Sequence, residues 1–196
     1  MTAAPAQEIR PAGPVRATVT VPGSKSYTQR ALIAAALADG RSTLRRPLIA
    51  EDTTLMADAL GALGASITPA GDDLAVAGTG GRLAVPAREI RLGNNGTATR
   101  LLLSVVALGQ GDYTITGEER LKQRPVKPVL DALTALGSAW TCTQRDGYPP
   151  VVVHARGLDG GTVRFADLDS SQYVSSILLA APNARGEVPK RSIGAV

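Results

Sequence analysis

Apolar positions recur along the chain with two spacings, which together predict strands alternating with helices. Alternation of apolar residues with period two, rich in β-branched types, is typical of strands; apolar residues three and four positions apart are typical of helices. Strands are expected at 15–21, 42–48, 90–92, 113–116, 139–143 and 151–154. Helices are expected within 24–40, 52–63, 97–108, 125–136 and 171–181. The fold class is therefore α/β (α+β).

Turn and cap residues mark the ends of these elements. Ser24 or Ser26 is suited to cap the first helix, and Asp52 is suited to cap the second. Gly64 follows the second helix at the position where a left-handed residue commonly ends a helix. Glycine-containing turns predict two β-hairpins, at 71–73 and 145–148. The elements therefore group into a unit of strand, helix, strand, helix and hairpin (βαβαββ).

This unit occurs more than once. Asp58-Ala59-Leu60-Gly61-Ala62-Leu63-Gly64-Ala65 returns 73 positions later as Asp131-Ala132-Leu133-Thr134-Ala135-Leu136-Gly137-Ser138. A period of this length indicates a repeated α/β unit. The helix at 171–181 begins a third unit, which we expect to be incomplete because no second helix pattern follows. We expect a flexible lead-in at 1–13, a strand within 14–22, one domain at 23–187 and an irregular tail at 188–196.

Composition and charge narrow the classes of function. Aromatic residues make up only 3% of the chain, which argues against base stacking on single-stranded nucleic acid. The net charge of +4 is spread along the chain and suits small anionic substrates. One cysteine (Cys142) and one histidine (His154) exclude a Cys/His zinc site. No apolar run is long enough to span a membrane, and no secretory leader pattern is visible, so we expect a cytoplasmic protein.

Each expected unit opens on a polar segment at the start of a helix. Unpaired N–H groups and the helix dipole make a helix N-terminus favourable for anions. A serine at one helix start is most often only a cap, but the openings occur at equivalent places in successive units. They therefore predict a shared anion site. The openings are Gly23-Ser24-Lys25-Ser26 with Arg30, Gly93-Asn94-Asn95-Gly96-Thr97 with Arg100, and Ser170-Ser171-Gln172.

Two other motif interpretations fail. The segment 23–26 lacks the first glycine and the Gly-Lys pair of a P-loop. The segment 109–111 lacks the third glycine of a dinucleotide-binding motif and follows a helix instead of a strand. Cys142 and His154 lie in expected strands without catalytic partners, so we interpret both as structural.

Four motifs occur along residues 22–173. They are Pro22-Gly23-Ser24-Lys25-Ser26-Tyr27-Thr28-Gln29-Arg30-Ala31-Leu32, Leu92-Gly93-Asn94-Asn95-Gly96-Thr97-Ala98-Thr99-Arg100, Arg120-Leu121-Lys122-Gln123-Arg124-Pro125 and Ser170-Ser171-Gln172-Tyr173. They resemble motifs of the 5-enolpyruvylshikimate-3-phosphate synthase family, also called 3-phosphoshikimate 1-carboxyvinyltransferase. They occur in the family's order, which is far more specific than any one of them alone.

The resemblance implies the enolpyruvyl transferase fold, in which two similar domains of three βαβαββ units close on the substrates. The segment 14–22 would then be a strand of the other domain, and 23–187 a substrate-binding domain cut within its third unit. The acidic and lysine residues that move protons in the family would lie in the other domain. No catalytic residue is therefore expected in this chain, which is interpreted as a fragment of less than half a family member.

The resemblance also implies the ligands and the residues that bind them. Shikimate 3-phosphate and phosphoenolpyruvate would be the substrates, with no metal or organic cofactor, no nucleic acid, no membrane and a monomeric full-length enzyme of aromatic amino acid biosynthesis. Lys25, Ser26 and Arg30 would bind shikimate 3-phosphate. Lys25 would also reach phosphoenolpyruvate. The other expected binding residues are Asn94, Gly96 and Arg124 for phosphoenolpyruvate, Ser170 and Ser171 for the shikimate phosphate, and Gln172 for both ligands.

Two departures and two alternatives accompany this interpretation. Leu101 stands where the family often has a proline, and the tail from about Val188 differs from the family's continuation. UDP-N-acetylglucosamine enolpyruvyl transferase, a relative with the same fold, carries Lys-Asn where this chain has Lys25-Ser26, and Cys142 does not match its reactive cysteine. The alternative of another class is a non-catalytic anion-binding fragment or pseudogene product.

Overall fold

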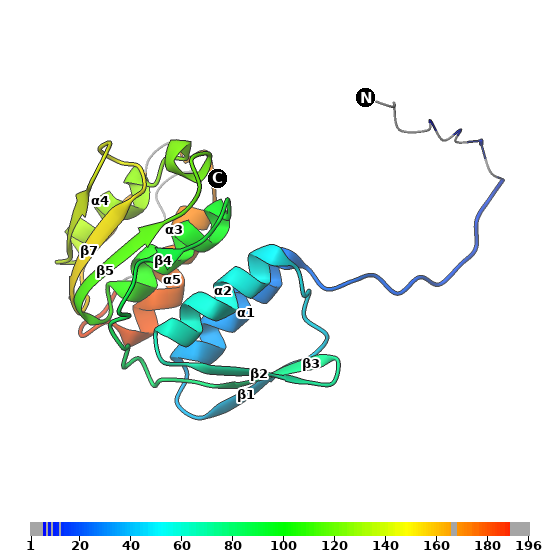
Figure 1. The fold of residues 1–196 in the computed structure, drawn as a ribbon, viewed down its shortest axis with the longest axis horizontal. Helices are drawn as coiled ribbons and strands as arrows, with labels where there is room; N and C mark the ends of the chain where they lie inside the picture. Colours follow the sequence, from blue (N-terminus) through cyan, green and yellow to red (C-terminus); the bar gives the residue numbers. More distant parts are fainter. Residues whose placement is uncertain (1–5, 7, 9, 12, 166–167, 189–196) are drawn as a thin grey trace.

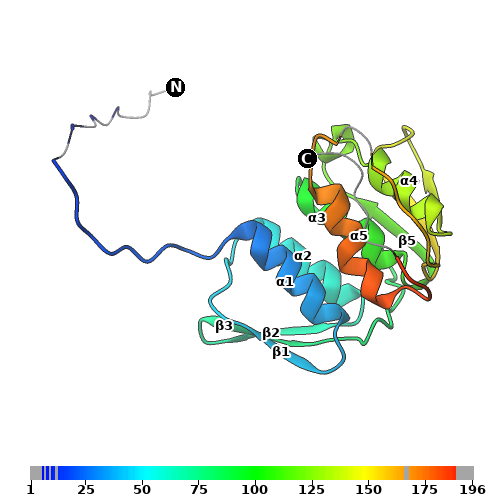
Figure 2. The same cartoon turned by 180° about the vertical axis from the view of Figure 1, so that it is seen from behind.

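The computed structural model describes residues 6, 8, 10–11, 13–165 and 168–188, and these form two α/β units (Figure 1). The first unit covers residues 25–77 and the second covers residues 90–156. Helix α1 (Lys25–Leu37) of the first unit contacts α3 (Gly96–Val106) of the second unit and also α5 (Gln172–Ala180), which follows that unit, so the helices face one another across the boundary. Each sheet lies on the outer side of its own helices (Figures 1 and 2).

The first unit has a three-stranded antiparallel sheet in the order β1-β3-β2. Leu44 pairs with Leu74, and Ile67 pairs with Val76, so both neighbours of β3 are fixed in register. The predicted hairpin at 71–73 is confirmed as the β2–β3 connection. The elements are α1 (Lys25–Leu37), β1 (Arg41–Leu44), α2 (Glu51–Ala62), β2 (Ser66–Ala70) and β3 (Asp73–Ala77).

The second unit has a four-stranded sheet in the order β4-β5-β7-β6. Its first two strands are parallel, and the others are antiparallel. The elements are β4 (Ile90–Arg91), α3 (Gly96–Val106), β5 (Gln110–Thr116), η1 (Leu121–Gln123), α4 (Lys127–Ala135), β6 (Ala139–Cys142) and β7 (Val151–Arg156). Helix α5 (Gln172–Ala180) and η2 (Ala181–Asn183) follow. The second unit is therefore a full βαβαββ unit, which confirms the predicted fold class.

The sequence repeat forms the same helix end in both units. The glycine after each repeat, Gly64 or Gly137, has a left-handed backbone with φ of +108° or +83°. The N–H of the residue after this glycine then donates to the main-chain carbonyl five positions earlier. This bond gives a partner to a carbonyl that would otherwise be unpaired at the end of the helix. Those bonds are Ala65 to Leu60 at 3.1 Å and Ser138 to Leu133 at 2.9 Å. A conformation that favours glycine thus accounts for the repeated Leu-Gly pair.

Helix α3 lies at the centre of the structure, between the second sheet and α5. It is buried on nearly all sides, including the consecutive residues Leu101, Leu102 and Leu103. Its one buried hydroxyl toward α5, Ser104, lies 2.6 Å from that of Ser176. The pairing meets the rule that a buried polar group needs a hydrogen-bond partner. The opening helix of the expected third unit therefore completes the core of the second.

The segment predicted as a strand at 15–21 forms no strand within the described part of the chain, and its expected place in the sheet of the other domain stays a prediction. The segment is extended but pairs with no strand, and it leads away from the body of the molecule (Figures 1 and 2). Val15, Val19 and Val21 are 77%, 75% and 76% exposed. An alternating segment forms a strand only where a partner offers backbone hydrogen bonds, and no described strand lies beside this one.

Two boundaries of the first unit also differ from the predictions. The strand expected at 42–48 ends at Leu44, because Arg46 has a left-handed backbone (φ +44°) and its N–H bonds the Asp73 carboxylate at 2.9 Å. Helix α2 begins one residue before Asp52, with Ala50 as its N-cap, and the Thr53 hydroxyl accepts the Ala50 N–H at 2.9 Å. Because the Asp52 carboxylate does not cap α2, it is available to pair with a side chain of another element.

The predicted domain boundaries stay predictions. Most of the lead-in at 1–13 and all of the tail beyond Val188 lie outside the described residues. Between α5 and Val188 the structure has only η2 and irregular chain. The third unit is thus represented by its opening helix alone within the part of the chain that the structure describes.

Candidate anion-binding site

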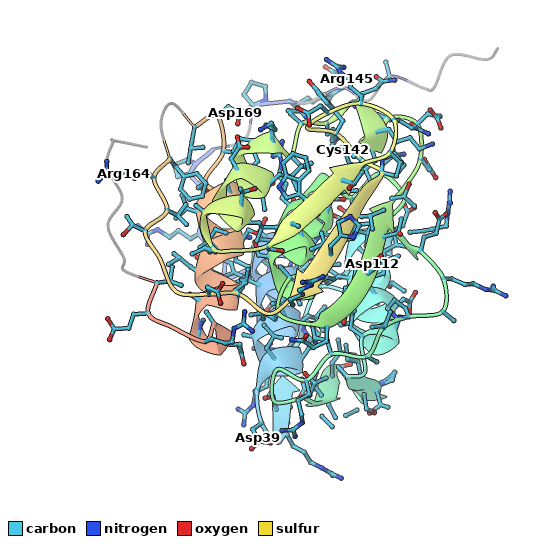
Figure 3. The ribbon with its side chains drawn as sticks, turned by 90° about the vertical axis from the view of Figure 1, so that its left-hand side faces the viewer. Asp39, Asp112, Cys142, Arg145, Arg164 and Asp169 are labelled. Carbon is cyan, nitrogen blue, oxygen red and sulfur yellow. The ribbon has the colours of Figure 1, made fainter. Side chains whose placement is uncertain are left out.

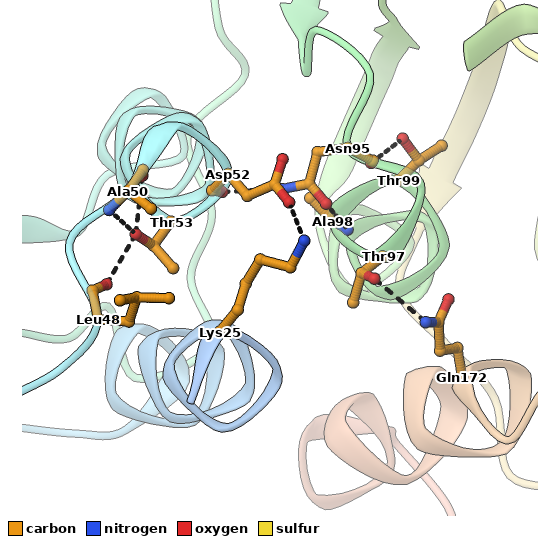
Figure 4. Close-up of polar contacts among 10 residues, drawn as sticks. All are labelled: Lys25, Leu48, Ala50, Asp52, Thr53, Asn95, Thr97, Ala98, Thr99 and Gln172. Atoms are coloured by element: carbon orange, nitrogen blue, oxygen red, sulfur yellow. Dashed lines mark hydrogen bonds and ion pairs between the residues drawn. The ribbon is translucent and has the colours of Figure 1, made fainter. Parts of the chain in front are cut away.

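The first residues of α1, α3 and α5 approach one another, as the three polar openings predict. Figure 4 shows Lys25 from α1, Asp52 from α2, Asn95 and Thr97 from the start of α3, and Gln172 from α5 around this region. Hydrogen bonds link each opening to the next. Three helix N-termini therefore turn their free N–H groups and partial positive charge toward one area.

Lys25 forms an ion pair with Asp52. The Lys25 Nζ lies 2.6 Å from Asp52 Oδ2, and the two side chains are 51% and 28% exposed. A pair this accessible to water contributes about 0–1 kcal/mol to stability. Its main effect is to hold the ammonium group beside the N-terminus of α3, with two of its three N–H donors still available.

Asn95 connects the starts of α2 and α3. Its side chain is buried; its oxygen accepts the N–H of Ala98 at 2.9 Å, and its amide donates to the main-chain carbonyl of Asp52 at 2.8 Å. Asp52 was not among the expected site residues, and Asn95 lay within the second polar opening without an expected ligand. The sequence signal for Asp52 was its place at a helix start, where Asp and Asn are common caps.

Asn94, which was expected to bind phosphoenolpyruvate, is exposed and bonds the Glu118 carboxylate through its amide nitrogen. Its amide is therefore already engaged on the outer side of the opening. A ligand at α3 would compete with the Glu118 carboxylate for this donor.

Arg124 lies directly over the first residue of α3. A Cβ atom added to Gly96 would meet Arg124 Nη1 at 2.7 Å and Cδ at 3.1 Å. Because Gly96 has no side chain, the Arg124 guanidinium can approach the N-terminus of α3. An anion at this place would be attracted by the guanidinium and by the helix N-terminus. Gly96 and Arg124 are brought together as the prediction requires.

Gln172 and Arg100 join the second and third openings. The Gln172 amide donates to the Thr97 hydroxyl at 3.1 Å, and its oxygen accepts from Arg100 at 3.0 Å. The Arg100 guanidinium also lies over the ring of Tyr173, 4.7 Å from its centre. Burial raises the pKa of the Tyr173 phenol, and the charge of Arg100 partly opposes this effect.

Arg30 connects α1 to α5. Its guanidinium donates to the carbonyl of Ser26 at 3.1 Å and to the hydroxyl of Ser175 at 3.2 Å. Ser170 accepts the N–H of Gln172 at 3.3 Å, whereas the exposed Ser171 makes no side-chain cap bond. Arg30 was expected at this site, and its half-buried position between two openings suits a phosphate.

The remaining candidates behave as structural residues. His154 bonds Thr141 at 3.0 Å and Asp112 at 2.8 Å on the outer surface of the second sheet. Cys142 is a free, partly buried thiol at the end of β6, near the turn that carries Arg145 (Figure 3). A hollow of about 1010 Å³ lies between residues 45–49, α2 and the β2–β3 hairpin, but none of the expected binding residues lines it.

Among the described residues, no group of three or more His, Cys, Asp or Glu side chains is placed to hold a metal ion. None of the described helices has both the length and the apolar character needed to cross a membrane.

The fold and the order of these motifs correspond to a family of known structure. EPSP synthase from Acinetobacter baumannii superimposes with a TM-score of 0.78 and 29% sequence identity, over 90% of this chain and 41% of that chain. The sequence model of the family EPSP synthase (3-phosphoshikimate 1-carboxyvinyltransferase) matches residues 9–193 of this chain. The chain therefore belongs to the EPSP synthase family, as the four motifs predicted.

Curated relatives carry the same family name. A 3-phosphoshikimate 1-carboxyvinyltransferase from Syntrophobacter fumaroxidans is 48% identical over 180 residues, which are 92% of this chain and 43% of that protein. The corresponding protein of Methanothermobacter thermautotrophicus is 45% identical, over 91% of this chain and 42% of that protein. The chain thus spans less than half the length of these relatives, which agrees with its interpretation as a fragment.

Proposed function

We propose that this chain binds shikimate 3-phosphate and phosphoenolpyruvate, as one half of a 3-phosphoshikimate 1-carboxyvinyltransferase of aromatic amino acid biosynthesis. The observation that carries the proposal is the meeting of three helix N-termini beside Lys25, Arg30, Arg100 and Arg124, in a chain of this family. Among the described residues, only Lys25 of these four cations forms an ion pair, with Asp52, and the Glu118 carboxylate nearby bonds Asn94. The excess positive charge suits two phosphorylated substrates.

The proposed roles follow the placement of each opening. Arg30, with Ser26, Ser170 and Ser171, binds the phosphate of shikimate 3-phosphate between α1 and α5. Arg124, with Asn94 and Gly96, binds phosphoenolpyruvate at the start of α3. Lys25 and Gln172 lie between these two places and contact both ligands. Each charge-assisted hydrogen bond of this kind contributes about 1.5–3 kcal/mol.

The proposed reaction adds the 5-hydroxyl of shikimate 3-phosphate to the enol carbon of phosphoenolpyruvate. The methylene carbon gains a proton, and phosphate then leaves the tetrahedral intermediate as the enol ether forms. This chain binds and orients the substrates; the groups that move protons are expected outside it. We therefore expect the purified chain to release no phosphate from the two substrates above a control without enzyme.

A cytoplasmic location and a monomeric full-length enzyme without nucleic-acid or membrane partners are part of the same proposal. They are supported by the family of biosynthetic enzymes to which the chain belongs. UDP-N-acetylglucosamine enolpyruvyl transferase is the less favoured assignment, because the relatives found carry the shikimate name. If the chain bound neither substrate, the binding proposal would fail, and a pseudogene product without this function would be favoured.

Titration of the chain with each ligand, followed by backbone amide chemical shifts, tests the binding proposal. We expect millimolar dissociation constants, on the order of −4 kcal/mol, because one half of the site supplies only part of the contacts. Shifts should appear at 24–30 and 170–172 with shikimate 3-phosphate, and at 94–97 with phosphoenolpyruvate. Shifts confined to other parts of the chain would contradict the assignment.

Two arginine variants separate the two subsites. Arg30→Ala should weaken shikimate 3-phosphate binding at least tenfold, since one charge-assisted bond exceeds 1.4 kcal/mol, whereas Arg124→Ala should weaken only phosphoenolpyruvate binding. Arg185→Ala is the matched control, because Arg185 pairs with Asp159 beyond the other end of α5. Equal losses from Arg30→Ala and Arg124→Ala for both ligands would refute the division of roles.

A further inference from the structure

One hydrogen bond joins the two units close to the site, and Asn95 makes it. The side-chain nitrogen Nδ2 of Asn95 donates to the main-chain carbonyl of Asp52 at 2.8 Å. Among the described residues, no other hydrogen bond links the first unit, 25–77, to the second, 90–156. Asn95 is only 2% exposed, so a further part of a longer protein would have no access to its side chain. The bond therefore depends on this part of the chain alone.

The chemistry of this bridge requires an amide side chain. The oxygen Oδ1 of Asn95 accepts the N–H of Ala98 at 2.9 Å, while the nitrogen donates to Asp52, so the orientation of the amide is fixed. Aspartate and serine are equally good N-caps, but an ionised aspartate has no donor, and a serine hydroxyl ends one bond short of the amide nitrogen. The side chain of Ser24, the equivalent cap of α1, accepts only the N–H of Tyr27 among the described residues. Asn95 therefore does more than cap α3.

The main chain of Asn95 is held as firmly as its side chain. Its N–H donates to the carbonyl of Leu92 at 2.9 Å. Its carbonyl accepts the N–H of Thr99 at 3.1 Å and the Thr99 hydroxyl at 2.9 Å. Every polar group of Asn95 thus has a partner, as expected for a buried residue. The N–H that points to Asp52 is therefore fixed in place relative to α3.

The bridge determines where the Lys25 ammonium lies. The carbonyl of Asp52 is held by Asn95, and the Asp52 carboxylate pairs with Lys25 Nζ at 2.6 Å. Figure 4 shows these three side chains between α1 and the start of α3. Lys25 has a flexible four-carbon stem and is 51% exposed, so packing alone does not fix its charged end. Asp52 fixes it, and Asp52 is in turn held by Asn95.

We propose that Asn95 is a positioning residue that holds the Lys25 ammonium at the N-terminus of α3, between the places proposed for the two substrates. The effect on ligands rests on the proposed function, in which Lys25 contacts both. When the bridge is lost, both charges of the Lys25–Asp52 pair remain, and only their position relative to α3 changes. Asn95 therefore acts on affinity through the place of Lys25 and leaves the net charge of the site unchanged.

Asn95→Ser tests the position of Lys25 without any ligand. Serine keeps a good N-cap for α3 but cannot reach the Asp52 carbonyl. The full chain is labelled with ¹⁵N in its lysine side chains, and the Nζ signals are compared by NMR. We expect the Lys25 signal to move and the Lys127 signal to stay, because Lys127 pairs with Asp131 on α4, away from the bridge. An unchanged Lys25 signal would overturn the proposal.

The same variant tests the consequence for ligands. Titration followed by backbone amide shifts should show both shikimate 3-phosphate and phosphoenolpyruvate bound about fivefold more weakly by Asn95→Ser, which corresponds to about 1 kcal/mol. Thr79→Val is the matched control. It removes a hydroxyl that donates to the Ala36 carbonyl at 3.1 Å, which is another bond from a side chain to the main chain, at the far end of α1. This control should leave both affinities unchanged.

The outcomes separate this inference from the proposed function. If the unmodified chain binds the ligands and Asn95→Ser binds them equally well, the positioning role is refuted while the proposed function stands. Equal losses in Asn95→Ser and Thr79→Val would indicate a general loss of stability and would also overturn the role. If the unmodified chain binds neither ligand, the proposed function fails, and the Lys25 signal alone decides whether Asn95 positions the ammonium.

Discussion

Gly96→Ala should separate the stability of the fold from the function of the site. The added methyl group lies in the first turn of α3, where alanine is favoured over glycine by about 0.5–1 kcal/mol. The three atoms nearest to the new Cβ position all belong to Arg124, whose Nη1 lies 2.7 Å away. Because this atom is the far end of a flexible side chain, it can move away at little cost. We expect the free energy of unfolding to stay unchanged or to rise by less than about 1 kcal/mol.

The same substitution should weaken phosphoenolpyruvate binding. Displacing the Arg124 guanidinium removes about 1.5–3 kcal/mol from one charge-assisted contact, and each 1.4 kcal/mol corresponds to a tenfold change in affinity. An interaction that starts in the millimolar range would then fall below detection by amide shifts. Shikimate 3-phosphate binding should be unaffected, because its proposed contacts lie on α1 and α5.

Gly61→Ala is the matched control for this prediction. Gly61 lies in α2, and a Cβ atom there meets nothing within 4 Å. This variant should gain a similar free energy of unfolding, measured by urea denaturation, while both ligands bind as before. The reasoning fails if Gly96→Ala binds phosphoenolpyruvate as the unmodified chain does, or if it is destabilised by several kcal/mol.

Three further substitutions test individual contacts. Gln29 is fully buried on α1, and its amide has no hydrogen-bond partner among the described residues. Gln29→Met should therefore raise the free energy of unfolding by about 1–3 kcal/mol; a lower free energy in urea denaturation would contradict this. Asp52→Asn removes the carboxylate beside Lys25 but keeps the carbonyl that Asn95 bonds, so titration should show phosphate bound more tightly by about 1 kcal/mol, and weaker binding would contradict this. The raised pKa of Tyr173 means that the unfolded chain loses this proton first as pH rises. Stability should therefore fall with pH above the ordinary tyrosine pKa, and Tyr173→Phe should reduce the decline in urea midpoints.

The sequence predicted the elements whose signals are local. The glycines of the repeat mark both helix ends because a left-handed residue is needed there, whatever surrounds it. The segment at 15–21 is not paired within the described residues for the opposite reason. Its alternation is a local property, but pairing depends on a partner strand, which no local pattern supplies. Its apolar side chains are therefore exposed even though the pattern is that of a strand.

The site shows the same division between local and long-range information. Lys25, Arg30 and Gln172 could be predicted because each lies in a polar helix opening of a recognisable motif. Asp52 could not, because its importance comes from contacts between α1, α2 and α3 that are far apart in sequence. Asn95 lies in the second opening, but its role in joining α2 to α3 depends on the same long-range contacts. Asn94 and Asn95 are adjacent, yet only Asn95 is buried and joins two helix starts, whereas Asn94 turns outward to Glu118. The choice between two adjacent amides is thus decided by the packing of helix against helix, and the ion pair between Lys25 and Asp52 depends on that same packing.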